Sequence, residues 1–167
     1  MAKEQARSAA DPQVPLKLDE FLPYRLNVVA SLVSLALSRI YVDRYGIGVP
    51  EWRILVTLGE FEIMTAKAVG AHSHMHKTKV SRAVSALERR KLIVRRENRD
   101  DRREALLSLT PAGRAIYHDL APGALDFAHR LFETIDPADR DAFERAVDRL
   151  TERSRKLTGE AGAAAER

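Results

Sequence analysis

The sequence of 167 residues contains no cysteine, which excludes disulfide bonds, thiol-based redox sensing and thiolate metal sites. No run approaches the roughly 18 apolar residues that a membrane span needs, and the first fifteen residues lack the apolar core of a signal peptide. Aromatic residues make up only 6% of the chain, beside 45% hydrophobic and 31% charged residues. This composition is typical of a soluble folded protein. We therefore expect a cytoplasmic protein that does not associate with membranes.

Positive charge is concentrated in one stretch, residues 75–103. It holds eleven basic and four acidic residues, an excess of seven positive charges, whereas the whole chain carries only +4. The basicity thus belongs to one segment and not to the protein at large. A concentrated positive face indicates a protein that binds a polyanion such as nucleic acid.

Apolar spacing predicts the elements on either side of this stretch. Residues 22–45 have apolar side chains three and four apart, which predicts a long helix, and a second apolar set predicts burial on more than one side. A partner subunit is the simplest cover for such a helix. Further elements are predicted as helices at residues 51–59 and 66–72, a basic helix from about 77, strands at 93–97 and 104–109, and helices starting near 111 and 137.

The basic helix divides into two faces. Val80, Val84 and Leu87 fall on one face, which we expect to be buried. Serine, threonine and arginine, which reach base edges and phosphates, gather on the opposite face. The predicted DNA-binding residues of this helix are Lys77, Thr78, Lys79, Ser81, Arg82, Ser85 and Arg89.

The connection between the two strands, NRDDRR, is rich in arginine and contains no glycine. It predicts a longer hairpin turn than a two-residue one. Arginines at the tip of such a hairpin can enter a minor groove, so Arg102 and Arg103 are also predicted to bind DNA. The alternative is a hydrophilic hairpin tip with no partner.

A second interpretation concerns the run of His72, His74 and His76. Alternate residues of an extended turn could converge on zinc, whereas on a helix only His72 and His76 share a face. No cysteine and no evident carboxylate ligand lies nearby, so we expect no metal and no cofactor. We expect these histidines to be turn residues near the DNA backbone.

Four motifs resemble the MarR family of winged-helix regulators in order and spacing. They are PEWRILVTL at residues 50–58, KTKVSRAVSALERRKLIVR at 77–95, DDRR at 100–103 and LTPAGR at 109–114. The chain departs from the family pattern at two places. Lys91 replaces a glycine after the recognition helix, and His76 stands where the family often has a polar capping residue.

This resemblance implies a mostly α-helical protein with a small β-wing, built as a winged helix-turn-helix with long N- and C-terminal dimerisation helices. It implies a homodimer on a two-fold DNA operator. Thr78, Lys79, Ser81, Arg82 and Ser85 would line the major groove, while Asp101 braces the wing and Arg103 reaches the minor groove. The expected parts are a mobile arm at 1–15, a dimerisation helix at 16–48, the DNA-binding domain at 49–110, C-terminal dimerisation helices at 111–157 and a mobile tail at 158–167.

A narrower likeness involves FLPYRLN at residues 21–27, SRIYVDRYG at 38–46 and AHSHMHKTKVSRAV at 71–84. These segments resemble regulators of aromatic-acid catabolism, including repressors released by aromatic acyl-CoA thioesters. A carboxylate or CoA phosphate needs a cation, and an aromatic acyl group needs flat apolar walls. The ligand-binding candidates are Tyr24, Arg25, Arg39, Tyr41 and Trp52. The alternative is that Trp52 is core and the arginines form ion pairs at the dimer interface.

Three functions are left open. The first is a ligand-responsive transcriptional repressor, without enzymatic activity, that binds an aromatic acid or its CoA thioester. The second is a metal-dependent hydrolase that uses His72, His74 and His76, although no nucleophile or phosphate-binding motif accompanies them. The third is an architectural DNA-binding protein that is indifferent to sequence.

Overall fold

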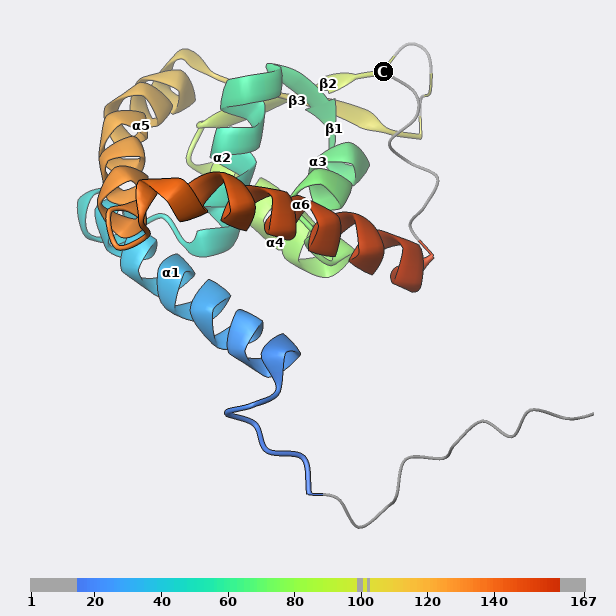
Figure 1. Ribbon diagram of the computed structural model, residues 1–167. Coiled ribbons are helices and arrows are strands. Elements are labelled where there is room, and N and C mark those ends of the chain that lie inside the picture. The colour runs from blue at the N-terminus through green and yellow to red at the C-terminus, as the bar shows by residue number, and fades with distance from the viewer. Residues whose placement is uncertain (1–14, 99–100, 102, 160–167) are drawn as a thin grey trace, which may run out of the picture. The chain divides into compact units, whose positions relative to one another are not determined.

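The computed structural model describes residues 15–98, 101 and 103–159. These residues are mostly helical, with one small sheet (Figure 1). The elements in chain order are α1 (Leu22–Tyr45), α2 (Val49–Phe61), β1 (Ile63–Thr65), α3 (Ala66–His72), α4 (Lys77–Arg89), β2 (Ile93–Glu97), β3 (Ala105–Leu109), α5 (Pro111–Phe132) and α6 (Pro137–Thr158).

The chain separates into two compact units, one up to Tyr117 and one from His118 onward. The division falls inside α5 and does not coincide with a boundary predicted from the sequence. The first unit contains α1 to α4, the sheet and the start of α5. The second contains the rest of α5 and α6, where Phe132 and Phe143 meet edge to face with ring centroids 6.1 Å apart.

Helix α1 has the bounds that the apolar spacing predicted. It has Pro23 in its first turn, ends at Tyr45 and is capped by Gly46, whose φ of +56° is the left-handed conformation that glycine tolerates best. Most of its surface is exposed in the single chain, including the apolar side chains of Leu32 and Leu35. By length and composition alone it could also cross a membrane. Counting uninterrupted apolar residues missed this property, because Arg25 and Arg39 interrupt the helix.

The core of the first unit forms around α2. Ile54, Leu55 and Leu58 are fully buried, and Trp52 is nearly so. Trp52 stacks on Tyr41 of α1, with ring centroids 5.0 Å apart and planes inclined by 16°. Burial raises the pKa of the Tyr41 phenol, an effect that nearby Arg53 partly opposes. These contacts hold the end of α1 against α2.

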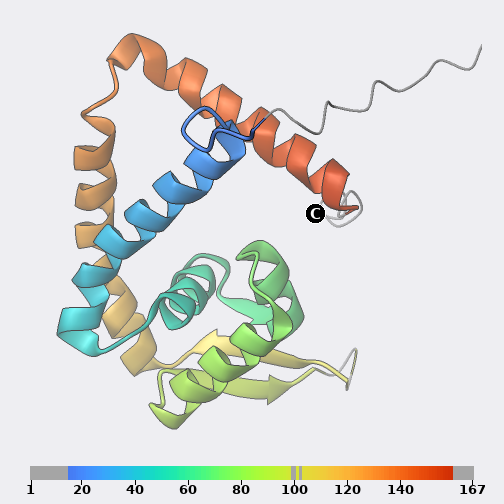
Figure 2. The same ribbon diagram turned by 90° about the horizontal axis from the view of Figure 1, so that it is seen from below.

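The sheet contains a strand that the sequence did not predict. Strand β1 has only three residues, too few to show an alternating pattern, yet it pairs with β3 from Ile63 opposite Ser108 to Thr65 opposite Leu106. The strand order is β1-β3-β2, with both pairings antiparallel. Strands β2 and β3 form the predicted hairpin, which extends away from the helices of this unit (Figures 1 and 2).

The two departures from the family pattern keep the expected local structure. His76 caps α4, because its Nδ1 accepts a hydrogen bond from the N–H of Thr78 at 3.3 Å. Lys91 adopts a φ of +56°, the conformation for which glycine is favoured. The chain thus makes the turn after α4 with a strained lysine in place of a glycine.

Candidate nucleic-acid interface

Helix α4 lies on the first unit with one side buried and one side exposed. Val80, Ala83, Val84 and Leu87 are buried, because they pack toward α2, α3 and β2. The opposite side has the predicted polar character. Lys77, Thr78, Lys79, Ser81, Arg82 and Arg89 are exposed, while Ser85 is half-buried.

The start of α4 is fixed by its packing against α3. Thr65 caps α3 by accepting a hydrogen bond from the N–H of Ala68 at 3.1 Å. Gly70 of α3 allows close approach, since a Cβ at this position would lie 3.2 Å from a methyl group of Val80. The two helices and their turn form a helix-turn-helix whose second helix is the basic one.

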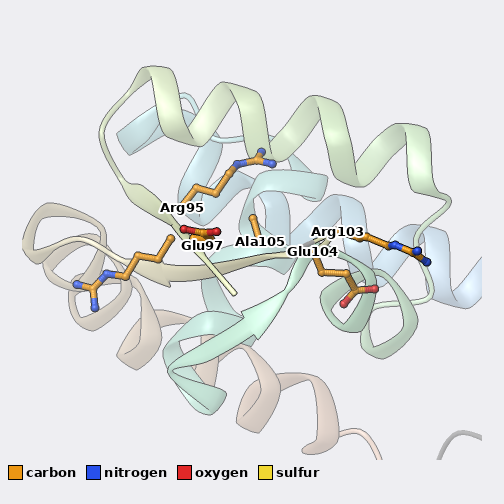
Figure 3. Close-up of a pocket in the computed structure, with 6 residues that line it drawn as sticks. Arg95, Glu97, Arg103, Glu104 and Ala105 are labelled. Atoms are coloured by element: carbon orange, nitrogen blue, oxygen red, sulfur yellow. The ribbon is translucent and has the colours of Figure 1, made fainter. Parts of the chain in front are cut away.

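The hairpin is tied to α4 by an ion pair. Arg95 of β2 donates from Nε and Nη2 to the two carboxylate oxygens of Glu88, at 3.1 and 3.0 Å. The hydrogen bond that Arg95 donates to Glu88 raises the pKa of Arg95, so the guanidinium is held more firmly in its charged form. Figure 3 shows Arg95 reaching toward α4, whereas Arg103 points away along the hairpin. Arg95 therefore braces the wing, and Arg103 remains available to a partner.

A shallow hollow of about 360 Å³ lies on the hairpin (Figure 3). Its lining residues are Arg95, Arg96, Glu97, Arg103, Glu104 and Ala105. Glu104 also lies 3.6 Å from the ammonium group of Lys67 on α3. Three arginines and two glutamates line it, so the hollow has a formal net charge of only +1.

Asp101, predicted to brace the wing, makes two hydrogen bonds near the hairpin tip. A carboxylate oxygen of Asp101 accepts a hydrogen bond from the backbone N–H of Arg103 at 2.9 Å. The backbone carbonyl of Asp101 accepts another from Glu104 at 3.0 Å. Arg102, also predicted to bind DNA, lies outside the described residues.

The five candidate ligand-binding residues do not gather at one place within a single chain. Tyr41 and Trp52 stack in the core, with 1% and 6% of their surface exposed. Tyr24 and Arg25 lie near the other end of α1, about 25 Å from Tyr41 along the helix axis. Arg39 is exposed near the end of α1 that carries Tyr41. A pocket made from all five residues stays a prediction.

Each of the three histidines at residues 72, 74 and 76 makes contacts within the protein. His76 caps α4, and His72 meets the ring of Phe61 edge to face at 4.8 Å. His74 adopts a φ of +49° in the turn between the two helices. In the part of the chain that the structure describes, no group of three histidine, aspartate or glutamate side chains is placed to hold a metal ion.

Sequence reasoning missed two contacts near the interface. One is the Glu88–Arg95 ion pair just described. The other is made by Arg90, whose Nη2 and Nη1 donate to the backbone carbonyls of Tyr45 and Gly46 at 2.6 and 3.2 Å. Arg90 was counted only among the basic residues. No local pattern could reveal its contact, because its partners lie 45 and 44 residues away in the sequence.

Known proteins share this architecture. The sequence profile of the MarR family matches residues 45–104. An uncharacterized HTH-type transcriptional regulator of Bacillus subtilis (strain 168), YwoH, is 24% identical over 126 residues, which cover 75% of this chain and 90% of YwoH. A MarR/EmrR family transcriptional regulator from Acinetobacter sp. ADP1 has a structure with a TM-score of 0.77 at 25% identity, over 84% of this chain and 99% of that one.

A third protein, BpsR of Bordetella bronchiseptica, has been solved in relation to regulation of its DNA binding by 6-hydroxynicotinic acid. Its structure has a TM-score of 0.73 at 21% identity, over 83% of this chain and 99% of that one. The predicted fold, a mostly helical winged helix-turn-helix, is confirmed. These proteins are regulators, which confirms the expectation that the chain is not an enzyme.

Proposed function

We propose that this chain, a transcriptional regulator of the MarR family, is a homodimeric repressor that binds a pseudo-palindromic operator. An aromatic carboxylate or its CoA thioester is the effector that releases it from DNA. The observation that carries the proposal is the division of α4 into a buried apolar side and an exposed side with Thr78, Lys79, Ser81 and Arg82. Threonine, serine and arginine read bases, and lysine contacts phosphates.

The wing supports the same function. Arg103 follows the turn at Asp101, and within the described residues its side chain forms no ion pair with an acidic residue. A cation at the tip of a hairpin is placed to enter the minor groove beside the major groove that α4 reads. In this proposal α4 supplies the base contacts, while the wing adds affinity and fixes the orientation of the domain on the duplex.

A second copy of the chain is the proposed cover for α1. Leu32 and Leu35 are 60% and 61% exposed in the single chain, a large apolar surface for a protein in water. Helix α6 also exposes an apolar row made of Phe143, Val147 and Leu150. A homodimer would bury such surfaces, and it would separate the two recognition helices by about one duplex turn, roughly 34 Å. Because a dimer that binds operator DNA must reach the chromosome, the proposed location of the protein is the cytoplasm and not a membrane.

The effector class rests on chemistry that the chain can offer. Tyr41 and Trp52 are flat apolar side chains that would have to separate to admit an aromatic ring, because they stack in the core, and Arg39 is an exposed cation on the same part of α1. The regulation of BpsR by 6-hydroxynicotinic acid, an aromatic carboxylate, belongs to that protein. It makes this class of compound the first to test here. An effector acts only through a difference in affinity for the DNA-bound and released states.

Footprinting on the DNA upstream of the chain's own gene tests the proposal. The expected result is a protected two-fold site, lost on addition of an aromatic acid or its CoA thioester. Random duplex of the same length is the control, because an architectural protein would bind both DNAs alike. Release by the thioester alone would support the narrower class of repressor. Protection that no aromatic compound alters would refute the effector class and leave the DNA-binding function standing.

A further inference from the structure

Arg90 joins the end of the recognition helix to the end of α1. It is the residue that follows α4, and its guanidinium group donates to the carbonyls of Tyr45 and Gly46, the last residue of α1 and its cap. The two bonds leave from different nitrogens of the same group. The contact therefore has the two-pronged geometry that arginine offers and lysine lacks.

The chemistry of a helix end explains why a cation lies here. The last carbonyls of a helix lack intrahelical donors and together carry a partial negative charge. Gly46 turns the chain in the left-handed conformation, and its own N–H is used within the helix end, donating to Val42 at 2.8 Å. The next carbonyls thus remain available as acceptors, and Arg90 supplies both donors.

The end of α1 that accepts the Arg90 hydrogen bonds is anchored in the core. Ile47, which follows the cap, is fully buried, and Tyr41, four residues before the end of α1, stacks on Trp52. On the other side, Leu87 and Leu92 are buried on either side of Arg90 and anchor the end of α4 in the core. A rotation of α4 relative to α1 would therefore stretch or break the two Arg90 bonds.

We infer that Arg90 is a positioning residue for operator recognition, which fixes the angle between the recognition helix and the helix that forms the dimer. The inference rests on the proposed function, since it needs both a DNA operator and a dimer built on α1. Arg90 acts through protein carbonyls and not through DNA. Loss of the Arg90 side chain should change the spacing between operator half-sites that the dimer prefers. It should leave the number of phosphate contacts unaltered.

This role differs measurably from a phosphate contact. A cation that neutralises one phosphate changes the slope of log affinity against log salt by about 0.9. A positioning residue leaves that slope unchanged and instead alters the preference for one spacing of the half-sites. Lys91 provides the matched control, because it is the adjacent exposed cation and its side chain makes no hydrogen bond or ion pair with the described residues.

The experiment compares the wild type with Arg90→Met, Arg90→Lys and Lys91→Met on the footprinted operator, on versions with one base pair added or removed between half-sites, and on random duplex. For Arg90→Met we expect affinity for the native operator to fall about tenfold. We also expect a reduced preference for the native spacing, an unchanged salt slope and little change on random duplex. Arg90→Lys should fall between the wild type and Arg90→Met, and Lys91→Met should keep the wild-type spacing preference.

Circular dichroism and thermal unfolding of each variant accompany the binding measurements. If Arg90→Met does not fold, Arg90→Lys is judged by the same readings. A salt slope lowered by about 0.9, or an unchanged spacing preference, would overturn the inference. Equal changes in spacing preference for Arg90→Met and Lys91→Met would overturn it too, because they would reflect charge alone. If the wild type itself does not prefer operator to random duplex, the proposed function has failed as well.

Discussion

Replacement of Gly113 by alanine tests how closely the start of α5 packs against the turn that follows the recognition helix α4. Gly113 lies in the first turn of α5, and its N–H donates to Oγ1 of Thr110 at 3.1 Å. The Thr110 hydroxyl in turn donates to the carbonyl of Lys91 at 2.7 Å, and the Thr110 N–H donates to the carbonyl of Leu92 at 3.0 Å. The start of α5 is thus held against the turn that follows α4.

The expected loss of stability follows from one distance. A Cβ on Gly113 would lie 1.9 Å from the carbonyl oxygen of Leu92 and 2.9 Å from its carbon. These are backbone atoms, so no side-chain rotation relieves the overlap, and the turn itself must move. Alanine normally favours a helix over glycine by about 1 kcal/mol. Overpacking costs about 1 to 3 kcal/mol, and a backbone overlap this close lies beyond that range. The steric cost of more than about 3 kcal/mol is partly offset by the gain of about 1 kcal/mol in helix propensity. We therefore expect Gly113→Ala to lower the free energy of unfolding by about 2 kcal/mol or more.

Urea titration and thermal unfolding measure this change. A loss of 2 kcal/mol should lower the unfolding midpoint by about 4 to 8 °C for a chain of this size. Ala115→Gly is the matched control, because Ala115 is exposed on the same helix and should lose only about 1 kcal/mol of helix propensity. A Gly113→Ala variant as stable as the wild type, or more stable, would refute the steric reasoning.

Four further predictions concern DNA binding, strain and assembly. Arg82→Ala should abolish specific operator retention in a gel shift and leave the dimer intact, since a base-contacting arginine contributes about 1 to 3 kcal/mol. Arg103→Ala should weaken binding and flatten the salt dependence by about one phosphate contact, as a titration at several salt concentrations would reveal. Lys91→Gly should stabilise the protein by about 0.5 to 1 kcal/mol in urea, whereas Lys91→Ala should not, because its Cβ keeps the strain at φ +56°. Leu35→Glu should yield monomers in sedimentation experiments, and a stable dimer would place the interface elsewhere.

Elements with strong local signals were predicted well from the sequence. The bounds of α1, α3 and β2 agree with the structure, and α6 begins at residue 137 as expected. Apolar periodicity and capping residues, such as Thr65 and Asp136 in front of α3 and α6, act within a few residues. Strand β1 was missed because its three residues gain their stability from pairing with β3, more than 40 residues later. Pairing between distant segments leaves no trace in a short local pattern.

In the candidate site, too, local features could be predicted from the sequence and contacts between distant residues could not. The two faces of α4 follow from helical geometry, so the exposure of Arg82 and the burial of Val84 could be predicted. The geometry that orients α4 could not. Glu88 and Arg90 were visible only as charges, and their partners at Arg95 and at the end of α1 became evident only in the folded chain.

Strand β2 has a consequence for solubility as well as for DNA. In the order β1-β3-β2 it is an outer strand of the sheet, and an outer strand offers backbone groups on which a strand from another molecule can assemble. Arg95, Arg96 and Glu97 leave three of its five positions charged and exposed. An approaching strand would have to strip water from these charges or bring like charges together. The wing can therefore project from the protein without becoming a starting point for aggregation.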